Sequence, residues 1–221
     1  MKTYRGIYFV LVMLYCGSTG YAQEDPSFDC VKASTQIEKV LCSGGNSGMG
    51  WIDQTMAALY KEVREAPGTD ASTLQANQRA WLARRNKCTG SDEEVMGCLF
   101  DSYRSRFAEL SSSYDRRHLT GRYKNDRVNG YLDSVLFPDG SLSVSITSNG
   151  GPPGYDQCAI AFRAPLNGER VYYMDSQNSP SPGNECTVEL TITGARIQVA
   201  PTGCLSYCGM AASFESVYNK Q

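Results

Sequence analysis

Eight of the nine cysteines follow residue 22, and they divide four and four between two halves of different character. The first half has helical periodicity and the second has strand periodicity. An even number in each half predicts disulfides within each half, two stapled domains that fold independently, and an oxidising compartment. We expect all eight to be structural disulfide cysteines: Cys30, Cys42, Cys88 and Cys98 in the first half, and Cys158, Cys186, Cys204 and Cys208 in the second.

The first 22 residues have the pattern of an export signal. Two basic residues precede an apolar run over 6–15, and Ala22 closes a short stretch with small residues, so we predict cleavage near Ala22. The alternative is a lipid anchor at Cys16, which the bulky Tyr15 before it disfavours. The apolar run is too short to span a bilayer. We therefore expect a periplasmic or secreted protein without a transmembrane segment in the mature chain.

Charge divides unevenly along the chain. Residues 23–115 hold 14 acids and 10 bases, whereas residues 116–221 hold nine of each. Removal of residues 1–22 takes away two bases and no acid, which moves the formal charge from −2 to −4. This balance disfavours a nucleic-acid partner and leaves a basic protein partner open. The plainer interpretation is an ordinary solvated surface.

The first half predicts a small helical bundle. An apolar stripe at 4-3-4 spacing runs along residues 52–63 and should end at Pro67-Gly68. A second stripe follows residues 99–110. Because a bundle of this size has a small core, disulfides are a common means of stabilising it. Three capping boxes mark helix starts: Thr35 with Glu38, Ser72 with Gln75, and Ser91 with Glu94.

Several motifs of this half resemble the LprI-type lysozyme inhibitor family. They are the run from Cys30 to Cys42 (CVKASTQIEKVLC), Asp53 with Leu59-Tyr60, Gln78-Arg79-Ala80-Trp81-Leu82 with Arg85 and Cys88, and Cys98-Leu99 with Tyr103, Arg106 and Leu110. The resemblance covers about residues 27–112. It implies a helical domain that inhibits lysozyme, with Asp53, Tyr60, Gln78, Trp81 and Arg85 at family-motif positions. One departure is the stretch 43–50 (SGGNSGMG), which replaces the helical continuation usual in the family.

Two features of this half admit a second interpretation. The Gly-rich stretch 43–50 lacks the Lys-Ser/Thr and the preceding strand of a phosphate-binding loop, so we expect a connection between helices. Trp81, Gln78 and Arg85 share a helix face and could form a recognition patch. At this spacing we favour Trp81 as a core anchor, with the two polar side chains at its edge.

The second half predicts about eight short antiparallel strands. Residues 142–146, 158–162 and 186–192 alternate apolar and polar side chains, and Asn167-Gly168 and Thr193-Gly194 mark hairpin turns. Such spacing favours a barrel or sandwich. The overall class is therefore α+β in two domains, at 23–112 and 121–221, with a linker at 113–120 inside a presumed hinge from Leu110 to Thr120.

Among the cysteines of the second half, we favour pairing Cys158 with Cys186 across the core and Cys204 with Cys208 around a small loop. Sequence permits three pairings in each half, and none is preferred in the helical half. A zinc site is the competing interpretation, but neither half has the paired CxxC spacing. We expect no metal and no cofactor.

The second half resembles the small eight-stranded barrels of MliC-type lysozyme inhibitors in architecture only, and no residue is carried over. A small-ligand-binding barrel would need a wide interior. Side chains such as Phe162 and Tyr173 can fill that space instead.

Catalysis is disfavoured. His118 is the single histidine and lies in the presumed hinge, whereas a Ser-His-Asp arrangement needs a histidine held between its partners. The acids lie mostly on predicted solvent faces, which disfavours a carboxylate pair for sugar hydrolysis. We expect a protein that is not an enzyme.

The preferred hypothesis is an exported, periplasmic binding protein that resembles a lysozyme inhibitor and blocks a muramidase, with a c-type lysozyme as candidate partner. The alternative is an envelope interaction or immunity protein with a partner other than lysozyme. Two loops, chosen for exposure and turn chemistry, are candidate partner-binding elements. Their residues are Ser43 and Asn46 in the first, and Asn149, Tyr155 and Asp156 in the second.

Overall fold

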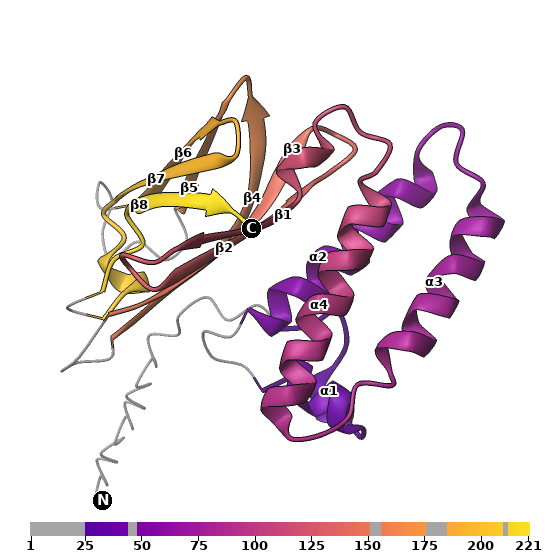
Figure 1. Cartoon of the computed structure of the whole chain (residues 1–221). Helices are drawn as coiled ribbons and strands as arrows, with labels where there is room; N and C mark the ends of the chain where they lie inside the picture. The colour runs from indigo at the N-terminus through magenta and orange to yellow at the C-terminus, as the bar shows by residue number, and fades with distance from the viewer. Residues whose placement is uncertain (1–24, 44–47, 151–155, 176–184, 210–211) are drawn as a thin grey trace, which may run out of the picture.

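The computed structural model describes residues 25–43, 48–150, 156–175, 185–209 and 212–221. The predicted signal segment with Cys16 and Ala22, and the loop residues Asn46 and Tyr155, lie outside these ranges. Within them, four α-helices precede a closed antiparallel barrel of eight strands (Figure 1). The predicted class is confirmed, and the β part is a barrel rather than a sandwich.

The helical part begins with a 3-10 turn and continues through helices joined by short connections. Thr35 and Ser91 cap their helices through complete capping boxes, as predicted. The third box is wrong, because Asp70 caps its helix and Ser72 already lies inside it. The elements are η1 (Cys30–Lys32), α1 (Gln36–Leu41), α2 (Met49–Glu65), α3 (Ala71–Arg85) and α4 (Asp92–Leu110).

The Gly-rich stretch is shorter as a loop than predicted. Met49 and Gly50 belong to α2, and Gly48 forms its N-cap with a φ of 73°. Glycine is favoured there because left-handed backbone is costly for other residues. At the other end α2 stops at Glu65, ahead of Pro67-Gly68, as predicted.

The barrel is an up-and-down meander in which each strand pairs with its sequence neighbours and β1 closes onto β8. Apolar side chains alternate into one core, which the strand patterns predicted. The strands are β1 (Gly121–Asn125), β2 (Gly130–Leu136), β3 (Ser141–Asn149), β4 (Gln157–Asn167), β5 (Arg170–Asp175), β6 (Cys186–Thr193), β7 (Arg196–Thr202) and β8 (Ser216–Lys220).

The two ends of the barrel differ in their connections. Short connections at 137–140, 168–169 and 194–195 form one end, which we call the tight-turn end. At the other end, which we call the long-loop end, residues 126–129 join β1 to β2, and longer segments separate the end of β3 from the start of β4, the end of β5 from the start of β6, and the end of β7 from the start of β8. In Figure 1 the gold turn η4 (Leu205–Tyr207) marks the long-loop end. Loops gathered at one end of a rigid scaffold are a frequent place for binding.

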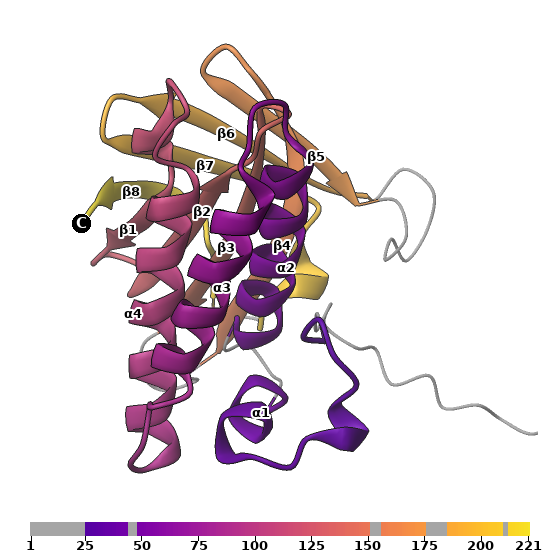
Figure 2. The ribbon, with the colours of Figure 1, turned by 90° about the vertical axis from the view of Figure 1, so that its right-hand side faces the viewer.

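The helices form a layer against one side of the barrel, with α2 and α4 next to it and α3 outermost (Figures 1 and 2). Val135 and Phe137 belong to the helical core although they come from the barrel half. The indole nitrogen of Trp51 donates to the Ser143 hydroxyl at 3.0 Å. Strand β3 is therefore buried on both faces, not half-buried as its alternation predicted. The two halves share an interface, which argues against independent folding.

The presumed hinge is packed, so that prediction is wrong. Leu119 is fully buried in the barrel core, and Ser111 and Thr120 are buried as well. The Thr120 hydroxyl donates to the Ser111 hydroxyl at 3.2 Å and accepts from the Leu136 amide at 3.0 Å. The polar residues that looked like a linker instead bond the end of α4 to β2 through the turn η3 (Arg117–Leu119).

All eight cysteines after residue 22 form disulfides, and none crosses between the halves, as predicted. The predicted pairing in the barrel is wrong. Strand β5 lies between the strands of Cys158 and Cys186, which places two strand spacings, about 10 Å, between them. A disulfide needs Cα atoms within about 7 Å. The observed pairs are Cys30–Cys42, Cys88–Cys98, Cys158–Cys208 and Cys186–Cys204.

The two barrel disulfides fasten residues 204–208 across the long-loop end. Cys204 bonds to the start of β6 and Cys208 to the start of β4, with Cα separations of 4.4 and 4.1 Å. Strands β4 and β5 pair only next to their turn, at Leu166–Asn167 with Arg170–Val171, so they diverge towards this end. We call residues 204–208 the strap, because they bridge this divergence.

Candidate functional site

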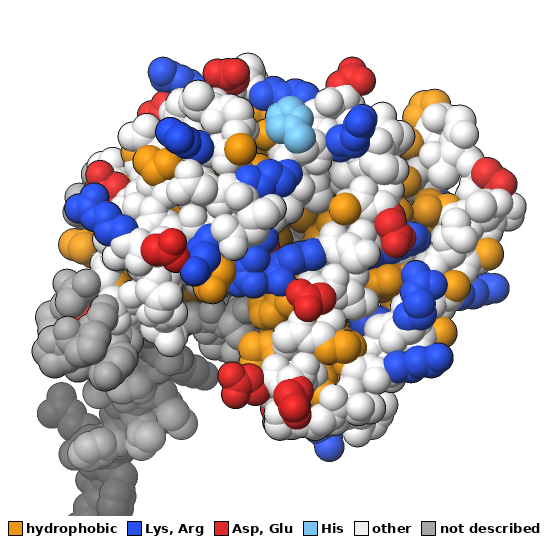
Figure 3. All heavy atoms as spheres, in the orientation of Figure 1, with side chains coloured by type: hydrophobic (Ala, Val, Ile, Leu, Met, Phe, Trp, Pro, Cys, Tyr) orange, Lys and Arg blue, Asp and Glu red, His pale blue; other side chains and the backbone are white. Residues whose placement is uncertain are grey.

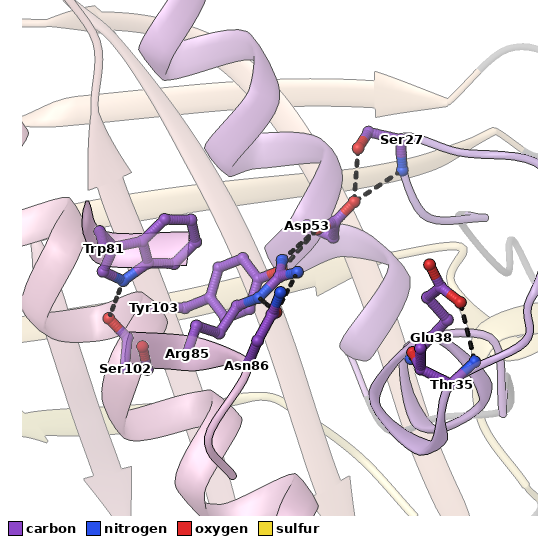
Figure 4. A network of polar contacts seen from close by, with 9 residues as sticks. All are labelled: Ser27, Thr35, Glu38, Asp53, Trp81, Arg85, Asn86, Ser102 and Tyr103. Carbon is purple, nitrogen blue, oxygen red and sulfur yellow. Dashed lines mark hydrogen bonds and ion pairs between the residues drawn. The ribbon is translucent and has the colours of Figure 1, made fainter. Parts of the chain in front are cut away.

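Three side chains from three helices meet in the interior of the helical layer (Figure 4). Asp53 comes from α2, Arg85 from the last turn of α3 and Tyr103 from the middle of α4. The Tyr103 hydroxyl donates to Asp53 Oδ1 at 2.5 Å and accepts from Arg85 Nη1 at 2.7 Å. Arg85 lies 3.6 Å from the same carboxylate oxygen. Two of the five family-motif positions therefore join in one polar cluster.

The second oxygen of Asp53 holds the N-terminal segment of the described chain. It accepts from the Ser27 amide at 2.9 Å and from the Ser27 hydroxyl at 2.5 Å. Sequence reasoning missed Ser27, for which the sequence carries no signal. It did not single out Tyr103 as a cluster member, although a tyrosine in an apolar stripe indicates a buried hydroxyl that needs a partner.

Trp81 and Gln78 lie beside this cluster. Trp81 is 3% exposed and packs edge-on against Tyr103 with ring centroids 5.1 Å apart, while its indole donates to the Ser102 carbonyl at 3.1 Å. Gln78 accepts from Arg106 Nε at 3.0 Å. Tyr60, the remaining motif position, is half-buried on α2. Trp81 is the single fully buried side chain of α3, which makes it the anchor of that helix.

The electrostatics of the cluster indicate a structural role. Burial raises the pKa of Tyr103 well above its ordinary value, and the negative charge of Asp53 adds to the rise. The neutral hydroxyl is therefore held in place to donate to the carboxylate. Because Asp53, Arg85 and Tyr103 satisfy one another inside the bundle, the arrangement orients helices and offers little to a partner. This makes Asp53 an exception to the expectation that the acids lie on solvent faces.

The two candidate loops adjoin strand β3 at different points along its length. Gly48 lies against Ser145 of β3, since a Cβ built there would be 3.5 Å from the Ser145 hydroxyl. Farther along, β3 ends at Asn149, which is exposed. The N-terminal end of α2 thus runs towards the long-loop end. Ser43 is exposed, and Asp156 is half-exposed beside Gly209.

Charge is separated along the barrel, although its half of the chain is formally neutral. At the long-loop end the solvent-facing acids outnumber the bases Lys124 and Arg127; they are Asp126, Asp156, Glu185 and Glu215. At the tight-turn end and the adjoining turn η3 bases dominate, namely Arg116, Arg117, Arg170, Arg196 and Lys220 against Asp115, Asp139 and Glu169. The end that carries Asn149 and Asp156 is therefore the acidic one.

The barrel interior is filled by side chains in the described residues. Phe162 and Tyr173 stack with centroids 4.4 Å apart, as expected for residues that occupy the lumen. His118 is exposed on η3, away from the acid–tyrosine cluster. Over the described ranges, no group of three or more histidine, cysteine or acidic side chains is arranged to hold a metal ion.

No helix in the described part of the chain has the length and apolar character needed to cross a membrane.

Comparison with known protein families gives a match to the helical part of the chain. Searches of curated proteins and of solved structures found no significant relative. The family model described as lysozyme inhibitor LprI matches residues 30–115, which span η1, all four helices and the first turn after α4. The resemblance stated from the cysteine, Asp53 and Trp81 motifs is thus confirmed for the helical region. The helical part of this chain, residues 30–115, carries the LprI lysozyme inhibitor domain.

Proposed function

We propose that this chain is an exported lysozyme inhibitor that blocks a muramidase by protein–protein contact. The observation that carries the proposal is the match of residues 30–115 to the lysozyme inhibitor LprI family. Four disulfides fit an extracytoplasmic protein, because such bonds persist in oxidising compartments. An inhibitory role also agrees with a protein that is not itself an enzyme.

The proposed contact surface is the long-loop end together with the adjacent start of α2. The motif residues Asp53, Arg85 and Trp81 are occupied inside the helical layer, so they support the surface and do not form it. Asn149 and Asp156 of the second candidate loop flank this end, and Gly48, after the first loop, lies against Ser145 in the middle of β3. The surface therefore combines elements of the helical and barrel halves.

Electrostatics favours this end for a cationic enzyme. A c-type lysozyme is basic, and the acids of the long-loop end exceed the bases there. Complementary charge raises the association rate and makes it salt-dependent. A carboxylate or hydroxyl presented from a loop could then enter the substrate cleft of the enzyme.

The strap gives this surface its rigidity. Cys204 and Cys208 fix both ends of the turn η4 to different strands. Inside the strap, the Tyr207 hydroxyl donates to the buried Asp175 carboxylate. Pre-organisation of this kind lowers the entropy lost on binding.

The test is a titration of the mature chain, residues 23–221, against a c-type lysozyme acting on cell walls. We expect inhibition at micromolar concentration. The double variant Asp126→Asn/Glu215→Gln should raise the half-inhibitory concentration about tenfold at low salt, which corresponds to about 1.4 kcal/mol. Glu189→Gln, which removes one negative charge in the middle of β6, away from the long-loop end, should leave it within twofold.

The absence of inhibition at micromolar excess would contradict the proposal. Binding without inhibition would point instead to the alternative hypothesis, an envelope interaction protein with another partner.

A further inference from the structure

The face of the molecule opposite in charge to the long-loop end carries a group of basic side chains where the barrel meets α4. Figure 3 shows Lys and Arg side chains running across the boundary between barrel and helices. We call this group the basic patch. Its members are Arg104 of α4, Arg117 of η3, Arg122 of β1, Arg196 of β7 and Lys220 of β8.

These residues are neighbours through β8 and the start of β1. Lys220 Nζ donates to the carbonyls of His118 and Thr120, which brings η3 against the end of β8. Arg196 pairs in register with Asn219 on that strand. The amide of Gln221 donates to the Arg122 carbonyl at 2.9 Å. The patch is thus one continuous surface assembled from separate parts of the chain.

Within the basic patch, Arg122 is the residue with a buried polar atom, Nε, that lacks a hydrogen-bond partner among the described residues. The nearest carboxylate, Asp133, lies 3.9 Å away and is already held by Arg104 at 3.0 and 3.4 Å. Burial lowers the pKa of Arg122, and the charge of Arg104 opposes its ionisation further. A second anion at the exposed part of the Arg122 side chain, which is 29% exposed, would offset this unfavourable charge environment.

The other acidic residues near the patch do not provide Arg122 with a carboxylate partner. Asp101 reaches Arg104 at 3.5 Å but is 85% exposed, and Asp126, equally exposed, pairs with Lys124. Arg117 and Arg196 have no acidic partner within the ranges that the structure covers. The patch therefore has more guanidinium groups than carboxylates positioned to pair with them.

The chemistry of the patch favours carboxylates on a polypeptide over a lipid surface. Arg122 lies over the Tyr131 ring at 3.7 Å and Arg104 over the Phe100 ring at 4.7 Å, so both planar groups are held in fixed orientations. A fixed guanidinium suits bidentate pairing with a carboxylate. Membrane surfaces are usually bound by flexible lysines with exposed apolar side chains. The large exposed apolar residues of the described chain, such as Tyr172 and Leu205, lie outside the patch.

We propose that the basic patch, centred on Arg122, is a second binding site that accepts the carboxylates of an acidic polypeptide segment. The site is separate from the acidic long-loop end, and it does not depend on lysozyme inhibition. A molecule with both surfaces could hold a cationic enzyme at one end and an acidic protein partner on another face.

The experiment titrates the full mature chain with hexaglutamate and follows the arginine Nε–Hε signals by NMR. We expect the Arg122 signal to shift, with an affinity that falls as NaCl rises from 50 to 300 mM. Arg122→Gln should weaken binding about tenfold, and Arg122→Lys, which keeps the charge and loses the planar fork, should weaken it about threefold. Binding is compared at a temperature at which every variant is fully folded.

Arg170→Gln is the matched control, because Arg170 is 71% exposed on β5, on the other side of the barrel, and pairs with Glu189. It should bind within twofold of the original chain. Equal binding by Arg122→Gln, or equal binding of hexaglutamine, would overturn the proposal. So would a response to inorganic phosphate or anionic phospholipid vesicles with none to hexaglutamate. Inhibition of lysozyme should persist in Arg122→Gln, which separates this site from the proposed function.

Discussion

Replacement of Asp53 by alanine tests whether the family-motif residues of the helical domain stabilise the fold or form a contact surface. The substitution removes the acceptor of the buried Tyr103 hydroxyl and the carboxylate partner of Arg85, whose side chain is 13% exposed. Breaking a buried pair by removal of one partner costs about 3–5 kcal/mol. Arg85 keeps the Asn86 side-chain oxygen Oδ1 as an acceptor at 2.9 Å, and exposed Ser27 regains water, so the lower end applies.

We therefore expect Asp53→Ala to lower the free energy of unfolding by about 3 kcal/mol and the melting temperature by about 6–12 °C. Asp53→Asn keeps an acceptor for Tyr103 and should cost about half as much. Asp101→Ala, which removes an 85% exposed carboxylate from the same bundle, should cost less than about 0.5 kcal/mol. Urea unfolding followed by circular dichroism measures all three.

The same variant separates stability from recognition. At a temperature where Asp53→Ala is fully folded, we expect unchanged lysozyme inhibition because the carboxylate is buried. A stability within about 0.5 kcal/mol of the original chain would refute the account of the cluster. Lost inhibition in a fully folded Asp53→Ala protein would show that the cluster itself takes part in recognition.

Three further outcomes follow from the structure. Burial raises the pKa of Tyr103, so its neutral form stabilises the fold at pH values below about 10, the pKa in the unfolded chain, and this contribution is lost as the pH rises above that value. Tyr103→Phe should therefore flatten the decline in the free energy of urea unfolding between pH 8 and 11. An unchanged slope would count against burial of the hydroxyl. Backbone amides that donate to Glu38 within the capping box lower its pKa to about 2. An NMR titration of the Glu38 carboxyl carbon should give this value. A pKa near 4 would mean that these hydrogen bonds are not formed. Chymotryptic cleavage after Tyr207 should place Cys204 and Cys208 on different disulfide-linked peptides, and a direct bond between these two cysteines would contradict the strap.

Features that depend on neighbours in sequence were predictable. The capping boxes at Thr35 and Ser91 involve residues three apart, and the alternation of Leu142, Val144 and Ile146 reports one strand face. The LprI motif also lies within one helical stretch of the chain. Local spacing carries this information because each element's geometry repeats over a few residues.

Features that depend on the arrangement of elements in space were not predictable. Ser143 and Ser145 look solvent-facing by period, yet α2 covers them. The disulfide pairing depends on β5 separating Cys158 from Cys186, which no spacing reveals. The meeting of Asp53 with its partners likewise requires the packing of three helices.

Amino-acid composition also failed to predict the structure of the segment between the two halves. Its serines and arginines resemble an exposed hinge, but Ser111 and Thr120 use their hydroxyls to join two elements. Polar side chains in a connection can be buried when they satisfy backbone groups. A composition rule does not distinguish the two cases.

The most direct test of the central claim is hydrogen exchange of the mature chain with and without a saturating c-type lysozyme. The account predicts protection of amides at the long-loop end, around Asn125–Gly130 and Ser213–Val217, and near Gly48 at the start of α2. The tight turns at 137–140 and 194–195 should exchange as in the free protein. No protection with excess lysozyme, or protection confined to the basic patch, would contradict the account.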